Sequence, residues 1–442
     1  MRLKIGVISL GCAKNRVDTE TLLGVLAGEY DFVAEVEQAD VLIINTCAFV
    51  NDAKEESIHT ILEAEEQKKA GKLKGIIVTG CLPQRFQQEL QELIPSVDAY
   101  LGVAAYKDIK KALEAIDHGS KYLNFENAAP PEHFLPRLIT TQPPTAYLKI
   151  SEGCNNCCAY CVIPSIRGPL RSRKTEDILS EMITLTQNGF NEIVLVAQDT
   201  TMYGVDIYGE SRIVDLVARA ALTPGLKWLR LLYCYPEHIT EELIDVMLKY
   251  DTVVPYIDMP VQHFDDAVLE SMNRKNTCAS TEKLVSMIRR KSEDFILRTT
   301  LIAGLPGETQ QAAAKNCDML KKLEFDRVGV FAYSQEESTK AAYMDYQIAE
   351  EEKLRRRDEL MAIQAEISLR KNQARIGKTY EVLVEGYDPQ SRCYFGRSYA
   401  EAPDADGKIL IDSAQPLTAG TYYPVTIRQA FYYDLKGEIE AK

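Results

Sequence analysis

Three cysteines lie close together near the middle of the chain, at Cys154, Cys158 and Cys161, with the spacing Cys-x3-Cys-x2-Cys. Three thiolates cannot ligate all the irons of a four-iron cluster, so one iron stays open. An open metal at a catalytic site accepts a ligand, as a catalytic zinc does. S-adenosylmethionine can chelate such an iron through its amino and carboxylate groups, and electron transfer into its sulfonium then yields a 5′-deoxyadenosyl radical. The spacing predicts a radical S-adenosylmethionine site.

A zinc site with a fourth ligand from elsewhere in the chain is the alternative for the same cysteines. Zinc sites more often use paired Cys-x2-Cys units, which favours the cluster. Cys157 falls outside the spacing and is interpreted as a bystander. The cysteine loop follows a strand-like segment, residues 146–150, and therefore belongs on the carboxyl rim of a parallel sheet, where such folds hold their sites.

A second group of cysteines, Cys12, Cys47 and Cys81, is spread over the first part of the chain. Each follows the end of a strand-like segment by one to three residues. In a parallel sheet all three emerge on one carboxyl edge, which is where open α/β folds bind ligands. We therefore expect a second three-cysteine cluster site with one open iron. The alternative is three unrelated buried cysteines, which are common in protein cores.

The elements that must position these cysteines begin with residues 1–125. Short Val- and Ile-rich segments alternate there with helical patterns, which predicts an open parallel α/β sheet domain. The strands are expected at 3–9, 41–45 and 75–79, and the helices at 18–30, 52–69 and 84–93. A polar stretch punctuated by prolines, residues 126–143, is expected to be a linker.

Residues 144–375 return to alternation and predict a partial (β/α)6 barrel, since eight repeats would close a full one. Its strands are expected at 146–150, 192–197, 228–233, 256–260, 296–303 and 327–333. Residues 349–376 follow as one long charged helix, interpreted as a solvated strut between domains.

Residues 376–442 predict a small all-β barrel, because short strands alternate with Gly, Pro and Asp turns. The strands are expected at 380–385, 393–398, 408–411 and 422–429. From Gly377 onward the chain carries seven Lys or Arg and ten Asp or Glu. A barrel that grips RNA should be basic, so this acidic one suits a basic protein better.

The composition of the 442 residues is that of a globular protein, with 46% apolar and 26% charged residues. No run of about 18 apolar residues and no signal-peptide core occurs, so we expect no membrane span and a cytoplasmic location. In that reducing compartment the eleven cysteines favour metal or redox chemistry over disulfides. The net charge of −14 argues against a nucleic-acid partner, although a local basic patch would permit one.

Further candidates are polar residues near the ends of the central strands. Arg298 is expected to pair with the cofactor carboxylate, because arginine suits planar carboxylates, with a structural ion pair as the alternative. Gln198 and Gln262 are candidates for cofactor contacts, with ordinary loop hydrogen bonds as the alternative.

A basic group beside the cysteine loop could meet a substrate carboxylate, although a solvated surface loop is the simpler interpretation. It comprises Arg167, Arg171, Arg173 and Lys174. His238 and His263 also lie on the rim, but we assign neither as a metal ligand because no partner ligand is visible in the sequence.

Several motifs together resemble the methylthiotransferase family of radical S-adenosylmethionine enzymes. Residues 11–20, 45–47 and 79–81 resemble the N-terminal domain of that family, and residues 152–164 resemble its radical domain. The C-terminal barrel resembles its TRAM domain. The resemblance covers essentially the whole chain, in the family's order.

Two branches of the family matter: one modifies a tRNA adenosine, and the RimO type modifies an aspartate of ribosomal protein uS12. The chain is similar to the second branch at residues 9–15, 163–173, 235–238 and 330–334. It departs at Ala13, where proline is frequent, and at Cys157, where a basic residue is frequent. Two other functions stay open: a tRNA adenosine methylthiotransferase, and an iron–sulfur scaffold or electron carrier.

The resemblance implies two [4Fe-4S] clusters and S-adenosylmethionine as cofactors, with no catalytic residues beyond the six cluster cysteines. The radical would take a hydrogen from the β-carbon of the aspartate, and the second cluster would supply a methylated sulfur. The implied partners are uS12, free or in the small ribosomal subunit, and an electron donor such as flavodoxin or ferredoxin. A tRNA partner is not expected.

Overall fold

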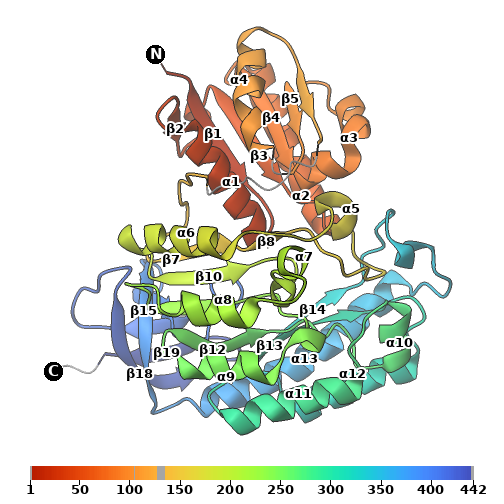
Figure 1. Ribbon diagram of the computed structural model, residues 1–442, viewed down its shortest axis with the longest axis vertical. Coiled ribbons are helices and arrows are strands. Elements are labelled where there is room, and N and C mark those ends of the chain that lie inside the picture. The colour runs from red at the N-terminus through yellow and green to blue at the C-terminus, as the bar shows by residue number, and fades with distance from the viewer. Residues whose placement is uncertain (1, 104, 127–134, 440–442) are drawn as a thin grey trace.

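The computed structural model describes residues 2–103, 105–126 and 135–439. Figure 1 shows an α/β sheet domain from the N-terminal part above a second sheet that carries helices, with a small β barrel beside the latter. This is the predicted order of an open α/β domain, a partial barrel and an all-β barrel, and the fold class is confirmed.

The N-terminal sheet has six parallel strands. Their order is β2 (Asp31–Val33), β1 (Lys4–Ser9), β3 (Val41–Thr46), β4 (Gly75–Gly80), β5 (Ala99–Leu101) and β6 (Tyr122–Asn124). Every residue of β3 and β4 is buried, because apolar clusters pack on both faces of the sheet. The sequence predicted β1, β3 and β4 and missed the three strands of three residues each.

Four α-helices accompany this sheet: α1 (Ala13–Leu26), α2 (Asn51–Lys69), α3 (Cys81–Leu93) and α4 (Ile109–Asp117), with short 3-10 turns at Val36–Gln38 and Tyr106–Asp108. The helices predicted at 18–30 and 84–93 begin earlier than expected, at Ala13 and Cys81. Cys12 therefore stands immediately before α1, and Cys81 is the first residue of α3.

The central sheet also has six parallel strands. Their order is β14 (Arg327–Ala332), β13 (Ile296–Ala303), β12 (Val253–Asp258), β11 (Trp228–Leu231), β10 (Glu192–Val196) and β7 (Thr145–Lys149). Among the described residues the first and last strands of this order do not pair, so the barrel is partial, as predicted. A two-stranded ribbon that the sequence did not predict, β8 (Ser151–Glu152) with β9 (Arg171–Ser172), brackets the cysteine loop.

The helices of the central domain are α5 (Ile163–Arg167), α6 (Thr175–Gln187), α7 (Val205–Tyr208), α8 (Ile213–Ala220), α9 (Glu241–Lys249), α10 (Asp266–Ser271), α11 (Cys278–Lys291), α12 (Gln310–Leu323) and α13 (Glu350–Gln373), with 3-10 turns at Thr200–Met202, Pro236–His238 and Lys340–Tyr343. Six of them, α6, α8, α9, α11, α12 and α13, contribute side chains to the main core on one face of its sheet. On β10, Ile193 and Leu195 join the main core, whereas Val194 and Val196 face the opposite side. This alternation gives the sheet a second apolar face.

The long charged helix α13 corrects one interpretation made from the sequence. It is not a fully solvated strut, since Leu360 and Ile367 are almost completely buried in the central core. Gln364 and Asn372 are buried as well and donate hydrogen bonds to backbone oxygens of Phe325 and Phe431. The helix lies along β14 and α12, and two of its charged residues, Lys353 and Arg356, are buried as well.

The C-terminal domain is a closed barrel with the order β15 (Thr379–Asp388), β16 (Cys393–Arg397), β17 (Ile409–Asp412), β19 (Leu435–Glu438) and β18 (Tyr422–Ala430). The sequence missed β19. The barrel packs on the second apolar face of the central sheet, where Leu383 and Ala402 join Val194 and Trp228 in one cluster. Arg397 pairs there with the buried carboxylate of Glu192 at 2.7 Å.

Buried ion pairs join the N-terminal domain to the central one at several places. Arg137, on the segment before β7, is 4% exposed and pairs with Glu20 of α1 and Glu181 of α6. Glu336, which follows β14, is 2% exposed and pairs with Lys54 and Arg85. The predicted boundaries at 125, 143 and 375 stay predictions, and residues 127–134 of the predicted linker lie outside the described residues.

In the described ranges, none of the helices combines the length and the apolar character that crossing a bilayer requires.

Candidate metal centres

The central cysteine loop is held in a single conformation by backbone contacts. Cys154 donates its backbone N–H to Gly168 O at 3.1 Å, and Ala159 donates to Met272 O at 3.0 Å. Gly153 has a φ of +78°, and a Cβ on it would lie 2.1 Å from Pro169 O, so only glycine fits directly before Cys154. Cys154 and Cys158 are 7% and 6% exposed, which places two of the three thiols out of water.

Two polar side chains lie beside the sulfur of Cys158. Tyr235 Oη lies 3.7 Å from its sulfur, and Arg274 donates to the same sulfur at 4.0 Å. The Arg274 guanidinium also stacks over the Tyr235 ring at 4.3 Å, which fixes both side chains. Cys157 is exposed, and its thiol donates to Asn155 O at 3.6 Å.

The N-terminal cysteines emerge side by side because their strands are neighbours in the sheet. Ser9 of β1 pairs in register with Asn45 of β3, which pairs with Thr79 of β4. Cys12, Cys47 and Cys81 follow these three strand ends. A Cβ on Gly11 would lie 3.0 Å from Cys47 Sγ, so the turn before Cys12 passes directly over Cys47. The geometry agrees with the expected common edge, and their role as ligands stays a prediction.

Two asparagines tie these strand ends together. Asn15 Nδ2 donates to Leu10 O at 3.0 Å and to Thr46 O at 2.8 Å, while the Cys81 thiol donates to Asn15 Oδ1 at 3.7 Å. Asn45 Nδ2 donates to Asn15 O at 2.9 Å. Because both asparagines are buried, these bonds fix the relative positions of the three cysteine loops.

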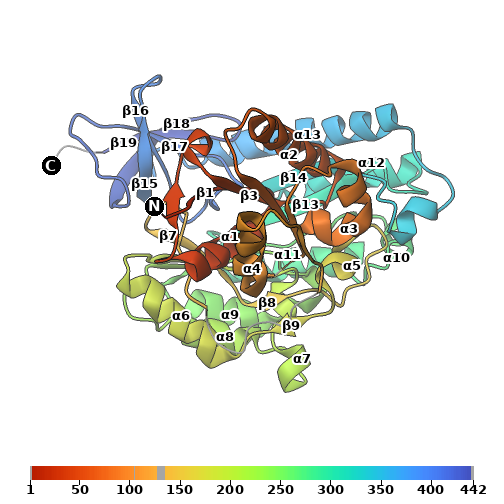
Figure 2. The ribbon, with the colours of Figure 1, turned by 90° about the horizontal axis from the view of Figure 1, so that it is seen from above.

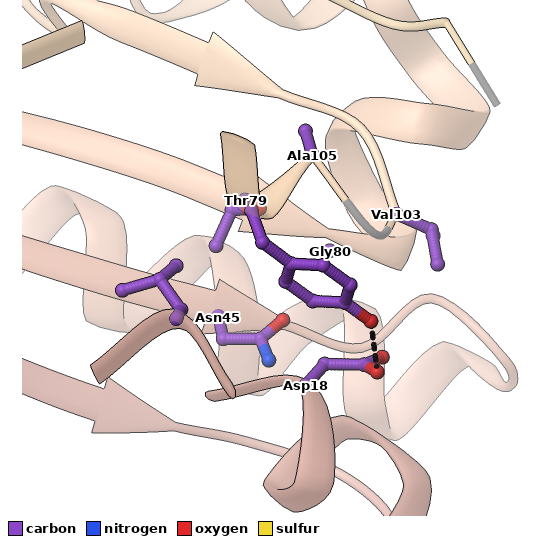
Figure 3. Close-up of a pocket in the computed structure, with 8 residues that line it drawn as sticks. Asp18, Asn45, Thr79, Gly80, Val103 and Ala105 are labelled. Carbon is purple, nitrogen blue, oxygen red and sulfur yellow. Dashed lines mark hydrogen bonds between the residues drawn. The ribbon is translucent and has the colours of Figure 1, made fainter. Parts of the chain in front are cut away.

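A small pocket opens beside the N-terminal site. Figure 3 shows the pocket, which is lined by Asn45, Thr79 and Gly80 from the ends of β3 and β4, by Asp18 of α1 and by Tyr106. The Tyr106 hydroxyl donates to Asp18 at 2.7 Å. Asn45 Oδ1 is buried without a hydrogen-bond partner. A buried acceptor of this kind is suited to a polar ligand.

Burial and charge act in opposite directions on the thiols. Burial raises the pKa of Cys81 to about 12 in spite of the nearby Arg167, and it raises the pKa of Cys161 to about 12 and of Cys154 to about 11. Burial also opposes ionisation of Cys12, but the positive charges of Lys14 and Arg167 prevail and lower its pKa. Metal binding therefore has to displace protons from most of these thiols.

The basic group beside the central loop is not a solvated surface loop, which corrects the simpler interpretation. Arg167 is 1% exposed and pairs with Asp18 and Glu152. Arg173 pairs with Asp177 and Glu181. Arg171 donates to Arg167 O at 3.1 Å, and Lys174, immediately before α6, is exposed. Arg167 is thus engaged inside the protein and does not face a substrate carboxylate.

The candidate cofactor contacts divide into two kinds. Gln198 and Gln262 each keep a buried Oε1 without a hydrogen-bond partner, as do the hydroxyls of Tyr160 and Tyr333. Buried acceptors without a partner fit a polar ligand, and Gln198 and Gln262 stay predicted contacts. Arg298 pairs with Asp258 at 2.8 Å and with Asp406 of the C-terminal barrel at 3.5 Å, as the alternative of a structural ion pair expects, and its contact with the cofactor carboxylate stays a prediction.

Both rim histidines lie beside carboxylates, those of Asp199 and Glu308. His238 Nδ1 lies 3.5 Å from Asp199 Oδ2, and His263 Nδ1 accepts the N–H of Asp265 at 2.9 Å. No trio of His, Cys, Asp or Glu in the described ranges is arranged around a single metal ion. A four-iron cluster does not need such an arrangement, because each thiolate bonds a different iron.

Sequence reasoning missed the buried polar residues that surround the N-terminal site, namely Asn15, Asp18 and Glu152, and assigned Arg167 to the surface. Charged residues are almost never fully buried unless they are paired, so their composition suggested solvent. The signal was present in the motifs around Cys12 and Cys154, which contain Asp18 and Glu152.

Three family models match successive parts of the chain. "Uncharacterized protein family UPF0004" matches residues 4–102, the radical SAM superfamily matches residues 148–320, and the TRAM domain matches residues 376–439. The three predicted types of domain are therefore present in the predicted order.

Full-length relatives are similar as well. The protein "Ribosomal protein uS12 methylthiotransferase RimO" of Clostridium acetobutylicum is 44% identical over 441 residues, covering 99% of this chain and 98% of its own. The protein of the same name from Clostridioides difficile is 46% identical over 440 residues, covering 99% of each.

Solved structures share the fold at low identity. The radical S-adenosylmethionine methyltransferase TsrM from Kitasatospora setae aligns with a TM-score of 0.55 at 14% identity, covering 75% of this chain and 73% of its own. The cobalamin-dependent S-adenosylmethionine radical enzyme OxsB aligns with a TM-score of 0.52 at 14% identity, covering 83% and 56%.

Proposed function

Since the chain belongs to the family of RimO-type ribosomal protein uS12 methylthiotransferases, we propose that it methylthiolates the β-carbon of an aspartate in uS12. It is an enzyme of the radical S-adenosylmethionine methylthiotransferase type. The observation that carries the proposal is the presence of two cysteine trios, each with two buried members and one partly buried member, at the carboxyl edges of two parallel sheets on either side of one domain interface.

In this proposal Cys154, Cys158 and Cys161 hold one [4Fe-4S] cluster, and Cys12, Cys47 and Cys81 hold the other. When bound, the first group with S-adenosylmethionine supplies a carbon radical that takes a hydrogen atom, and the second supplies sulfur. Gln198 and Gln262 orient the S-adenosylmethionine through their free Oε1 atoms. Arg298 pairs with Asp258 and Asp406 and stays a proposed contact to the cofactor carboxylate through its remaining N–H groups.

The surrounding residues exclude water and fix positions. Gly153 allows the backbone at Cys154 to pass close to Pro169, and Asn15 locks the loops of the N-terminal trio. The buried network of Lys149, Asp18 and Glu152 fills the space between the domains with paired charges. A dry, preorganised site of this kind suits radical chemistry, because it protects a reactive intermediate from side reactions.

The acidic C-terminal barrel supports a basic protein substrate, whether uS12 is modified free or within the small ribosomal subunit, and disfavours tRNA. The chemistry also requires a reductant, for which we propose a flavodoxin or ferredoxin. These reactants all belong to the cytoplasm, and we place the enzyme there.

The test is the mass of uS12 from cells that lack this protein. We expect uS12 to be lighter by about 46 Da, the difference between H and SCH3 on one residue. Expression of the wild-type chain should restore the mass, and the Cys47→Ala chain should not. An unchanged uS12, together with loss of a methylthio group from tRNA, would refute the proposal in favour of the tRNA branch.

A further inference from the structure

Helix α5 carries a buried arginine between the two cysteine sites. In Figures 1 and 2 this short helix lies between the N-terminal domain and the central sheet, and it contacts α3, whose first residue is Cys81. Arg167 is the last residue of α5 and follows Cys161 by six positions. Its side chain is therefore placed by the central cysteine loop yet extends into the N-terminal domain.

The Arg167 guanidinium reaches the N-terminal site directly. One nitrogen, Nη2, donates to Asn15 Oδ1 at 2.5 Å and lies 3.6 Å from Cys81 Sγ, to which it also donates. Asp18 Oδ2 accepts from both terminal nitrogens at 3.1 Å. Asn15 holds the strand ends together through its hydrogen bonds to Leu10 and Thr46. Arg167 therefore contacts both Cys81, a predicted cluster ligand, and the residue that positions it.

The same guanidinium reaches back toward the central site. Nη1 donates at 2.8 Å to Glu152, which stands two residues before Cys154. Glu152 also accepts from Lys149 at 2.6 Å and from Gln198 Nε2 at 2.7 Å. Gln198 is the predicted cofactor contact whose Oε1 is free. A continuous series of hydrogen bonds thus runs from Gln198 through Glu152 and Arg167 to Cys81.

We propose that Arg167 is a positioning residue that joins the two sites and raises the reduction potential of the cluster bound at Cys81. The proposal rests on the proposed function, because it needs the N-terminal cluster to exist. Reduction adds negative charge to a cluster, and a hydrogen-bond donor or a fixed positive charge beside a ligand sulfur stabilises the reduced form. Burial strengthens this effect, because little water is present to screen the charge.

A purely structural role is the competing explanation, and the chain offers a matched control for it. Arg137 is also a buried arginine at the same domain interface, and it pairs with Glu20 and Glu181. Its polar contacts are to carboxylates and to Tyr147 O, not to a cysteine. Loss of Arg137 should therefore disturb the interface to a similar degree without acting on a cluster ligand.

The experiment is a redox titration followed by electron paramagnetic resonance. The parent is the full-length chain with Cys154, Cys158 and Cys161 all changed to Ala, so that any cluster signal comes from the N-terminal site. Arg167→Gln removes the charge, Arg167→Lys keeps the charge but cannot reach all four partners, and Arg137→Gln is the control.

For Arg167→Gln we expect the ratio of reduced to oxidised cluster at a fixed potential to fall about tenfold, which is about 59 mV for a one-electron couple. The reduction potential of Arg167→Lys should lie between those of Arg167→Gln and the parent. The Lys variant also keeps the test possible if Arg167→Gln does not fold. Arg137→Gln should keep the parent potential.

Three outcomes would overturn the inference. Equal reduction potentials in the parent and both Arg167 variants would show that Arg167 has no electrostatic role. A shift in Arg137→Gln as large as that in Arg167→Gln would show a general effect of the interface. A parent that binds no cluster at all would refute the assignment of Cys12, Cys47 and Cys81, and with it the proposed function and this inference. Iron and sulfide analysis of the parent separates that last case from the other two.

Discussion

The central site takes its three cysteines from a single loop, residues 154–161, whereas the N-terminal site takes one cysteine from each of three strand ends. In the first, spacing along the chain sets the distances between thiols, and hydrogen bonds to Gly168 and Met272 only orient the loop. In the N-terminal site, the distances between thiols follow from the register of β1, β3 and β4 and from the hydrogen bonds of Asn15 to the strand ends. The central site should therefore tolerate changes elsewhere in the fold, and the N-terminal site should not.

The largest expected effect separates the chemistry of the two sites. Cys158→Ala should abolish both deoxyadenosine formation and methylthiolation, while Cys47→Ala should abolish methylthiolation alone. The losses should reach at least about 100-fold, because even changes outside the ligand shell of a metal cost 10–100-fold. Both products can be quantified by chromatography and mass spectrometry of one reaction mixture. Normal methylthiolation by Cys47→Ala would remove the role assigned to the second site.

A glycine substitution tests the dependence of the N-terminal site on its fold. Gly80 has a φ of +97°, and a Cβ on it would lie 2.2 Å from Asn45 Oδ1. Gly80→Ala should lower the free energy of unfolding by about 1–3 kcal/mol and deplete iron at the N-terminal site. Urea denaturation and iron analysis measure these two effects.

The matched control is Gly71→Ala. Gly71 also has a positive φ, +73°, but no atom lies within 4 Å of the added Cβ, so only the backbone strain remains, about 1 kcal/mol. An equal loss of iron in both variants would contradict the importance of the close approach at Gly80.

The protonation of the buried thiols gives a pH dependence common to both sites. In the metal-free protein Cys81 and Cys161 keep their protons up to a pKa of about 12 because of burial, whereas an unfolded cysteine ionises near about 8.5. The unfolded state therefore loses protons first, and stability falls as the pH rises above about 8.5, by about 1.4 kcal/mol per pH unit for each such thiol.

Denaturant titrations of the metal-free chain between about pH 8 and 10.5 measure this slope. Cys81→Ala and Cys161→Ala should each make it shallower, by similar amounts if burial acts alike at the two sites. If neither substitution changes the slope, other groups govern the loss of stability at alkaline pH.

The smallest effect is expected for Cys157→Ser. This thiol is exposed and donates only to Asn155 O in the same loop, while Asn273 donates to the backbone O of Cys157, which the substitution retains. Stability should change by less than about 0.5 kcal/mol, and iron content should stay at the wild-type value. Loss of iron would mean that the spacing of the central loop was misinterpreted.

The same contrast explains what could be predicted from the sequence. Cys154, Cys158 and Cys161 form a local pattern, and Cys12, Cys47 and Cys81 could be grouped because each follows a strand of strong apolar character. The strands β2, β5 and β6 were missed because three residues are too few to show a period.

Contacts between domains were beyond prediction for a different reason. Arg167 meets Asp18, and Arg298 meets Asp406, across many positions of sequence. The sequence does not distinguish a basic residue that pairs with a buried partner from one that faces water, because the pairing depends on how the domains dock. For that reason the sequence alone does not show whether Arg298 faces a cofactor or an ion-pair partner, or that Arg167 is buried.

The docking of the C-terminal barrel bears on the order in which the protein matures. The loop before β17 packs on the second face of the central sheet, where Tyr256 donates to Asp406 at 2.6 Å and Tyr147 to Asp404 at 2.9 Å. A ribosome makes these aspartates after every cysteine of both sites. A nascent chain therefore presents all six thiols while the second face of the central sheet is still uncovered. Iron and sulfide delivered before the barrel docks would need no gate in the folded enzyme.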